Sequence, residues 1–427
     1  MSALHIEKLA IFCHGQKVGE LSQGDRKQIW FEYAPTWLTN GFDLSPKSLN
    51  FDLKPQLAKG SEFDGLHGVF SDSLPDGWGL LLMDREFKRR FDWSPHDITP
   101  IDRLAYIGSR AMGALEYLPI YEQEPIPGEV DLRRLSQSVD AVLQGQESAV
   151  LQQLIIQGGS PGGARPKVTI ARSQTSSICL SGFQELSGDY THWIVKFRSK
   201  EDPIDMGKIE FAYSKMAKLA GVEMPSTEII SLGGVLERED YFAVERFDRC
   251  NQNDRCHTIS LAGLLYANFR TPCMDYDGVL ATVRGLTKSQ EQIERAFRLM
   301  VFNVLAHNKD DHVKNFAFTW KKKEGWQLSP AFDLTYSTGM NGEHATAING
   351  QGRPTIKDVL AIAKKHQITN AKEIIEEVQD GTKQWKKIAK TCGVTPKSIS
   401  IIENEFLKVN KIFNSDPNQK YLRLPHS

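Results

Sequence analysis

A polar loop held between two apolar segments restricts the fold of this chain more than any other feature of its sequence. Residues 289–307 repeat apolar side chains at the spacing of one helical face. Residues 315–320 have the apolar character of a short strand. Between these segments, Asp, His, Lys and Asn side chains crowd into eight residues. Because both flanks belong in a core, the sequence predicts a polar loop that is pinned against that core.

The spacing of oxygen-bearing side chains in this loop indicates phosphoryl transfer. That reaction needs a carboxylate to orient the attacking hydroxyl group and accept its proton, with an oxygen ligand for magnesium beside it. Asp310 and Asn315 have the five-residue spacing of a kinase catalytic loop, and Asp311 is the alternative base. Asp333 follows 18 residues after Asn315, within the sequence F-D-L. We therefore predict Asp310 as the catalytic base, with Asn315 and Asp333 as Mg²⁺ ligands.

Two other interpretations of the loop remain open from the sequence. The polar residues could form a plain solvated loop, although the apolar flanks argue against it. The trio His307, Asp311 and His312 could instead belong to a metal-dependent hydrolase. Such a site would need further ligands from other helices, which the sequence does not point to.

A lysine upstream suits the binding of nucleotide phosphates, and a glutamate on the next predicted helix could pair with it. Lys196 follows the apolar run W193-I-V in a strand predicted at residues 192–199, as the nucleotide-binding lysine of kinases does. The alternative is a lysine that protects a sheet edge. Glu210 lies on a helix predicted over residues 208–220, where it either pairs with Lys196 or faces solvent.

A glycine-rich stretch and a charged strand end complete the predicted ATP site. In residues 158–167, Gly162 and Gly163 would let backbone N–H groups approach phosphates, and Lys167 would reach a phosphate. The stretch matches neither the P-loop nor the kinase glycine motif, so a plain turn is the alternative. The strand at residues 241–249 occupies the place of a kinase hinge, with the backbone of Glu245 to Phe247 at the adenine.

The order of predicted elements indicates an α+β protein with three parts. A β-rich first domain (1–128) contains a hairpin around His14-Gly15 and a helix over residues 76–91, and ends in a linker rich in Pro and Glu. Residues 129–250 are rich in strands, and residues 251–427 are mostly helical. The last two parts together are typical of a two-lobed, protein-kinase-like fold with a mixed N-lobe and a helical C-lobe.

Composition excludes several classes of protein. A net charge of −1 over 427 residues argues against a general polyanion binder. The sequence predicts no signal peptide and no run of about 20 apolar residues, so we expect a cytoplasmic protein without membrane association. Six cysteines without a CxxC pair are expected to be reduced thiols. A metal site at Cys250, Cys256 and His257 is the weaker alternative.

Taken together, these motifs resemble the HipA family of serine/threonine kinases, which act as toxins in bacterial type II toxin–antitoxin systems. The resemblance rests on S160-P-G-G-A-R-P-K167, W-I-V-K196, V-E-R-F-D-R249, D310-D-H-V-K-N315 and F-D333-L. Toward the N-terminus, G-Q-K-V-G-E-L, L74-P-D-G-W and G113-A-L-E-Y-L-P are similar to the family's N-terminal domain.

The resemblance implies a role for each matching residue. Asp310 would be the catalytic base, supported by His312 and Lys314 of the same motif, and Asn315 and Asp333 would bind Mg²⁺. The residues that would contact ATP are Lys167, Lys196, Gly162, Gly163, Glu245 and Phe247, with Asp248 nearby and Glu210 in support.

Ser160 falls on the serine that the family autophosphorylates. A phosphate there adds a charge of about −1.5 to −2, which would repel ATP and silence the enzyme. This chain departs from the family pattern at Pro161, Gly162 and Arg165, and Pro161 restricts the backbone of Ser160.

The resemblance also implies partners. These are a small HipB-like helix-turn-helix antitoxin, operator DNA reached through that antitoxin, and a protein substrate, which in relatives is a glutamyl-tRNA synthetase. Two alternatives remain: a kinase of similar fold that acts on a small molecule, and a degenerate kinase that only bridges antitoxin and operator. The presence of Asp310, Asn315 and Asp333 argues against the degenerate form.

Overall fold

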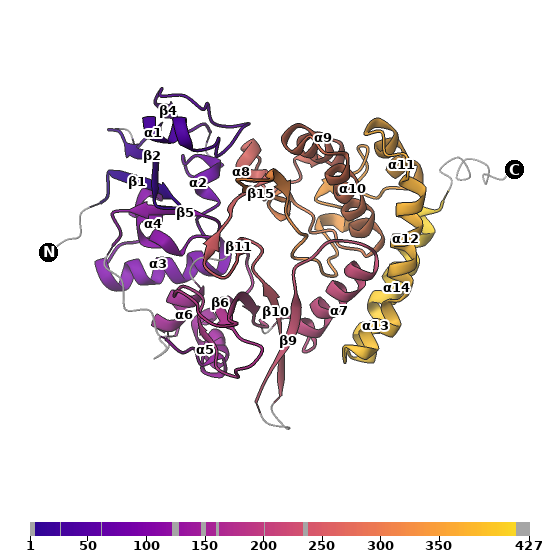
Figure 1. Ribbon diagram of the computed structural model, residues 1–427. Coiled ribbons are helices and arrows are strands. Elements are labelled where there is room, and N and C mark those ends of the chain that lie inside the picture. Colours follow the sequence, from indigo (N-terminus) through magenta and orange to yellow (C-terminus); the bar gives the residue numbers. More distant parts are fainter. Residues whose placement is uncertain are drawn as a thin grey trace, which may run out of the picture. The chain divides into compact units, whose positions relative to one another are not determined.

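The computed structural model of the chain consists of two compact units, which are described separately (Figure 1). It describes residues 5–25, 27–60, 62–121, 128–146, 151–158, 162–199, 201–233 and 238–415. The first unit comprises residues 1–207, 226–267 and 317–324, and the second comprises residues 208–225, 268–316 and 325–427.

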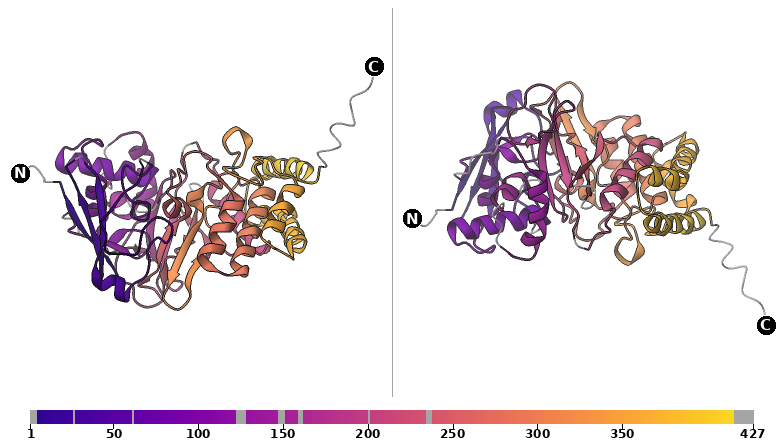
Figure 2. Two further views of the ribbon diagram at one scale, coloured as in Figure 1. Left: turned by 90° about the horizontal axis from the view of Figure 1, so that it is seen from above. Right: turned by 90° about the horizontal axis from the view of Figure 1, so that it is seen from below.

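The first unit begins with a five-stranded antiparallel sheet in the order β4-β3-β2-β1-β5 (Figure 2, indigo strands). His14 and Gly15 both have positive φ, as a tight hairpin turn requires, so the predicted hairpin is confirmed. The start of the predicted linker is instead the edge strand β5, because Leu115 and Tyr117 are buried against the sheet. The strands are β1 (Lys8–Cys13), β2 (Gln16–Gln23), β3 (Ile29–Tyr33), β4 (Gln56–Leu57) and β5 (Leu115–Leu118).

Four helices accompany this sheet. The predicted helix after Asp76 is confirmed as α3, and α4 packs against β1 and β5. Thr99 and Asp102 form a capping box that starts α4, since each side chain binds the other's backbone N–H. The helices are α1 (Pro35–Asn40), α2 (Gly68–Ser71), α3 (Gly77–Phe91) and α4 (Pro100–Ile107).

A second antiparallel sheet in the order β7-β6-β8-β10-β9 lies in the same unit. Residues 151–158, for which the sequence allowed helix or strand, form helix α6, which packs against β6. The strands are β6 (Lys167–Arg172), β7 (Leu180–Ser181), β8 (Thr191–Lys196), β9 (Thr227–Leu232) and β10 (Glu239–Glu245), and the helices are α5 (Leu132–Leu143) and α6 (Leu151–Gly158).

The remaining elements of the first unit follow the second sheet. Strand β13 pairs antiparallel with β15. Cys250 and Cys256 form a disulfide, so the expectation of reduced thiols is wrong for this pair. The elements are β11 (Arg249–Cys250), β12 (Asp254–Arg255), β13 (His257–Ser260), α8 (Leu261–Leu265) and β15 (Ala317–Lys321).

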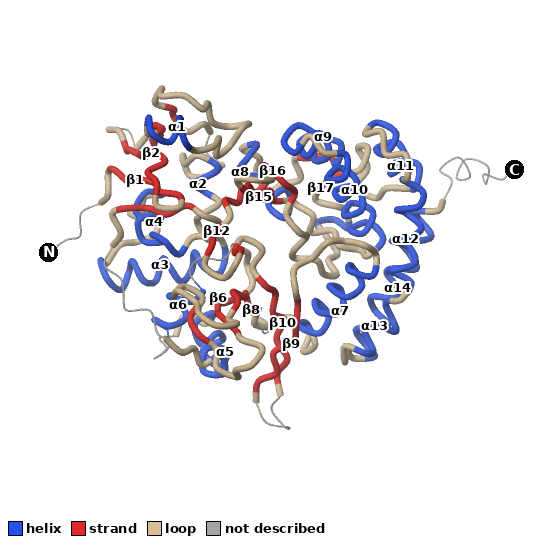
Figure 3. Tube along the Cα trace, in the orientation of Figure 1, coloured by secondary structure: helices blue, strands red, loops and turns tan. Residues whose placement is uncertain are grey.

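The second unit is mainly helical, as predicted (Figure 3, blue). The long helix predicted over residues 289–307 is α10, which is buried along most of its length and contacts α9, α12 and α14. The elements are α7 (Met206–Leu219, from residue 208), β14 (Met274–Asp275), α9 (Tyr276–Thr287), α10 (Gln290–Leu305), β16 (Gly325–Leu328), β17 (Thr346–Ala347), α11 (Ile356–Lys365), α12 (Ala371–Lys383), α13 (Trp385–Thr391) and α14 (Pro396–Phe413).

Within the described ranges, no helix has the length and apolar character needed to cross a membrane. The predicted boundaries at residues 128 and 250 stay predictions.

The close approach of α2 and α8 yields a prediction about stability. A Cβ added at Gly68 would overlap the backbone carbonyl of Gly263, which cannot rotate away. We expect Gly68→Ala to lower the free energy of unfolding by about 1–3 kcal/mol, as overpacked sites do. The control is Gly128→Ala, where an added Cβ meets no atom within 4 Å. Urea unfolding of both variants tests this, and equal stabilities would contradict the tight packing of α2 on α8.

Candidate active site

The loop after α10 is closed by hydrogen bonds between its two ends. Asn315 Nδ2 donates to the Asp310 carbonyl oxygen at 2.8 Å, and the Asn315 N–H donates to the His312 carbonyl oxygen at 2.8 Å. A single 3₁₀ turn, Val313–Asn315, forms the second half of the loop. The Asp310 side chain is 64% exposed, and its Oδ1 lies 4.0 Å from His312 Nε2. The loop therefore presents an accessible carboxylate on a backbone held by Asn315.

Asp311, the alternative base, has an entirely different environment. It is 1% exposed. Its carboxylate accepts hydrogen bonds from the Tyr276 hydroxyl at 2.9 Å and the Ala345 N–H at 2.9 Å, and contacts His344 Nδ1 at 2.8 Å. With both oxygens engaged, Asp311 anchors the loop and has no exposed oxygen for a substrate hydroxyl. Of the two neighbouring carboxylates, only that of Asp310 is accessible from solvent.

A second segment of the unit runs beside this loop and carries Asp333. The Ser337 N–H donates to the His307 carbonyl oxygen at 3.0 Å, and the Ala345 N–H donates to the Lys309 carbonyl oxygen at 3.2 Å. Asp333 has a left-handed backbone with φ of 52°, which Asp adopts more readily than most residues. The segment that bears Asp333 is thus fastened to the loop that bears Asp310 and Asn315.

The hydrolase interpretation is not supported by this geometry. His307 Nδ1 is bonded to the Ser337 carbonyl oxygen at 3.0 Å, and Asp311 is the buried anchor. Burial, and then the charge of Lys309, lower the pKa of His307. Across the part of the chain that the structure describes, no three or more His, Cys, Asp or Glu side chains are grouped to hold a metal ion.

In the first unit, two lysines face one another across neighbouring strands. Lys167 on β6 is the direct cross-strand partner of Lys196 on β8, and Lys196 is in turn the partner of Phe242 on β10. Residues directly opposite in a sheet point to the same face, so the three side chains form one row. Lys196 Nζ lies 5.5 Å from the centre of the Phe242 ring. Like charges in opposed positions destabilise a sheet, and an anion between them would reverse that effect.

The glycine loop lies next to these lysines. Gly163 has a φ of +104°, a conformation that favours glycine. Lys167 Nζ donates to the Gly162 carbonyl oxygen, and the Gly163 N–H donates to Asp76 Oδ1. The sequence predicted Asp76 as the N-cap of α3, and it holds that position in the backbone, but its side chain makes no capping bond. Ser160, the predicted phosphorylation site, lies outside the described residues.

The end of β10 carries a buried ionic cluster. Glu245 and Phe247 are partly exposed, whereas Asp248 is fully buried. The Asp248 carboxylate accepts hydrogen bonds from Arg246, Arg249 and the Gly113 N–H, all at 2.7–2.9 Å. Burial raises the pKa of Asp248, but the two guanidinium groups together outweigh it and hold the pKa well below its ordinary value.

Asp248 is predicted to lie near the nucleotide, and its burial limits how its side chain can act there. Its oxygens are occupied and none is accessible, so any effect on an adenine site comes through the strand end that it holds. The sequence did not identify Arg246, which is 3% exposed, as a structural residue. The signal available was the alternation of acidic and basic residues in V-E-R-F-D-R.

Three residues predicted to support the site, Glu210, His312 and Lys314, lie in the second unit. Glu210 lies on α7 and is 3% exposed, so it does not face solvent. Lys314 Nζ lies 4.7 Å from the centre of the Phe269 ring, and the His312 ring lies 5.8 Å from the same ring. Phe269 therefore lies against two basic side chains of the loop, His312 and Lys314.

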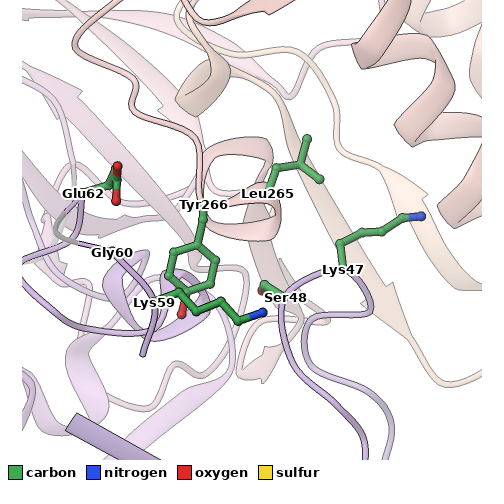
Figure 4. Close-up of a pocket in the computed structure, with 7 residues that line it drawn as sticks. All are labelled: Lys47, Ser48, Lys59, Gly60, Glu62, Leu265 and Tyr266. Carbon is green, nitrogen blue, oxygen red and sulfur yellow. The ribbon is translucent and has the colours of Figure 1, made fainter. Parts of the chain in front are cut away.

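A surface pocket of the first unit contains none of the predicted site residues (Figure 4). It is lined by Lys47, Ser48, Lys59, Gly60, Glu62, Leu265 and Tyr266. The Lys59 side chain runs toward Ser48, whereas the Lys47 side chain points away from Tyr266. Because its two lysines do not converge, this pocket has no built site for a phosphate group.

Comparison with known families decides the identity of the chain. The family described as HipA-like C-terminal domain matches residues 159–386, which is more than half of the chain. The chain belongs to the HipA family. The HipA N-terminal domain matches residues 9–118.

Individual relatives extend this comparison. "Putative kinase Y4dM" of Sinorhizobium fredii is 27% identical over 208 residues, which cover 43% of this chain and 50% of that protein. "Putative kinase" of Haemophilus influenzae is 22% identical over 189 residues, or 39% of this chain and 55% of that protein. The matches thus span about half the length of these curated relatives.

A solved structure shows the same fold. It is the Shewanella oneidensis complex of HipA, HipB and operator DNA from a toxin–antitoxin system. The match has a TM-score of 0.70 and 17% identity, and covers 95% of this chain and 97% of that chain. It confirms the predicted fold class, a two-lobed kinase-like α+β fold with an added N-terminal domain.

The Asp248 cluster allows a prediction about stability. We expect Asp248→Ala to lower the free energy of unfolding by about 3–5 kcal/mol, since two buried guanidinium groups lose their carboxylate. The control is Asp254→Ala, an exposed carboxylate on β12, with an expected change within about 0.5 kcal/mol. Denaturant unfolding measures both values, and similar values for the two variants would exclude a structural role for the cluster.

Proposed function

We propose that this chain is an ATP-dependent serine/threonine protein kinase that acts as a toxin. The observation that carries the proposal is the division of roles in the loop, where Asp311 is the buried anchor and Asp310 is exposed beside Asn315. In a HipA-family chain, this arrangement fits a carboxylate that accepts the proton of a serine or threonine hydroxyl group.

The donor set of the second unit fits a magnesium ion. Asn315 and Asp333 supply amide and carboxylate oxygens, which Mg²⁺ prefers, and Mg²⁺ needs only one or two protein side chains in addition to phosphates. When bound, the ion neutralises charge on the phosphate oxygens of ATP. Asp310 orients the attacking hydroxyl group, while His312 and Lys314 support the loop around it.

The nucleotide residues of the first unit have separate roles in the proposal. Lys167 and Lys196 bind phosphate oxygens, a role that fits their opposed positions on neighbouring strands. Gly162 and Gly163 shape the loop near the phosphates, although the Gly163 N–H is already donated to Asp76. Glu245 and Phe247 line the adenine, and Glu210 takes the role of the helix glutamate of kinases.

We extend the proposal to partners and regulation. The structural relative is a complex of HipA with HipB and operator DNA, which supports a small helix-turn-helix antitoxin for this chain and operator contact through it. The substrate would be a protein in the cytoplasm, such as a translation factor of the glutamyl-tRNA synthetase kind. Phosphorylation of Ser160 would add a charge of about −1.5 to −2, which would repel ATP and silence the enzyme.

Replacement of the proposed base tests the catalytic role. We expect Asp310→Asn to reduce transfer of the γ-phosphate of radiolabelled ATP to lysate proteins by about 10²–10⁴-fold, because the amide cannot accept the proton. The control is Asp380→Asn, an exposed carboxylate on α12, which should retain wild-type transfer.

The same assay separates the alternatives. Label on the purified chain that disappears in Ser160→Ala would support autophosphorylation. Label on a metabolite and on no protein band would contradict the protein-kinase proposal in favour of a small-molecule kinase. Growth on expression in cells gives a further test. If Asp310→Asn inhibits growth fully and the wild type transfers no phosphate, only the degenerate kinase that bridges antitoxin and operator remains.

A further inference from the structure

The glycine loop at residues 162–166 is seated on the N-terminal end of α3. The Gly163 N–H donates to Asp76 Oδ1, and the Trp78 N–H donates to the Gly163 carbonyl oxygen at 3.3 Å. The Trp78 indole Nε1 donates to the Lys167 carbonyl oxygen at 3.2 Å. Residues 76–78 therefore hold the loop both in its middle and at the point where it enters β6.

The seat depends on a close approach of two backbones. Gly77 has a φ of +43°, and a Cβ added there would overlap Ala164 Cα and the Gly163 carbonyl oxygen. On the other side, a Cβ at Gly162 would lie 3.4 Å from Asp76 Oδ1. Trp78 is 1% exposed, so its indole forms a rigid base beneath the loop. The loop and the start of α3 are shaped to each other.

The Asp76 side chain is used in an unusual way. An Asp at the N-cap position usually accepts a hydrogen bond from the first turn of its own helix. Asp76 makes no such bond and accepts the Gly163 N–H instead. Bonds from a backbone N–H to a carboxylate are stronger than those between neutral groups. The Asp76 side chain thus binds the glycine loop and does not cap its own helix.

The two sides of this contact come from different parts of the family architecture. Asp76 and Trp78 belong to the segment matched by the HipA N-terminal domain, residues 9–118. The glycine loop and Lys167 belong to the segment matched by the HipA-like C-terminal domain, residues 159–386. All of them lie within the first compact unit of the structure.

We infer that Asp76 is a positioning residue for the phosphate-binding loop, so that L74-P-D-G-W of the N-terminal domain forms part of the nucleotide site. By holding Gly163, Asp76 fixes the backbone that carries Lys167 toward its partner Lys196. The inference rests on the proposed function, since it assigns the loop to ATP phosphates. Loss of Asp76 weakens ATP binding and leaves the proton transfer at Asp310 unchanged.

Three variants test the role of Asp76 by KM for ATP and by kcat. We expect Asp76→Ala to raise KM for ATP about tenfold, with kcat nearly unchanged. A tenfold change corresponds to the lower end of the energy range of one hydrogen bond to a charged group. Asp76→Asn retains an oxygen that accepts the Gly163 N–H, so it should restore most of the affinity. The control is Asp84→Ala on the same helix, whose carboxylate pairs with Arg103 at 2.6 Å and not with the loop.

Hydrogen exchange of the nucleotide-free protein gives a second readout, which does not depend on kinase activity. The peptide covering residues 162–166 should exchange faster in Asp76→Ala than in wild type and Asp84→Ala. Unchanged exchange, or tighter ATP binding by Asp76→Ala, would overturn the positioning role. A different result is faster exchange in Asp76→Ala together with no ATP binding by the wild type. It would uphold the contact between Asp76 and the glycine loop, but it would overturn the proposed kinase function and the nucleotide role of the loop.

Discussion

Two lysines in opposed positions on neighbouring strands are the constraint on which the functional account depends. Lys167 and Lys196 are direct cross-strand partners, so their charges project from the same face of the second sheet. Such an arrangement is unfavourable by itself. The structure stabilises it by placing Lys167 Nζ on the Gly162 carbonyl oxygen and Lys196 Nζ over the Phe242 ring. In the proposed function, the phosphate groups of ATP use both charges together.

Buried carboxylates hold the backbone around the proposed site, and an exposed carboxylate is available to react with a substrate. Asp311 secures the catalytic loop through Tyr276 and His344, and Asp248 secures the end of β10 through its two arginines. Asp310 is mostly exposed. This division is what a phosphotransfer site needs, because positioning and electrostatics supply most of the catalysis. Asp76 is only half-buried, but its carboxylate likewise holds a backbone group, the Gly163 N–H.

The sequence predicted the elements whose signals are local. The hairpin at His14-Gly15, helix α3 and the long helix α10 follow from turn chemistry and from apolar periodicity. Strand β5 was missed because its partner β1 lies more than 100 residues away in the chain. The spacing of the motif favoured Asp310 over Asp311 as the base, but it did not predict how differently the two carboxylates are buried. Their difference comes from Tyr276 and His344, which are 35 and 33 residues from Asp311, and neither contact leaves a pattern in the sequence.

A structure determined with Mg²⁺ and a non-hydrolysable ATP analogue is the most direct test of the central claim. The account predicts phosphate oxygens within hydrogen-bond distance of Lys167 and Lys196, and the metal ion on Asn315 and Asp333. It also predicts Asp310 without a bond to the metal and Asp311 unchanged on Tyr276 and His344. Nucleotide bound away from both lysines, or Asp311 released from its anchor to face the phosphates, would contradict it.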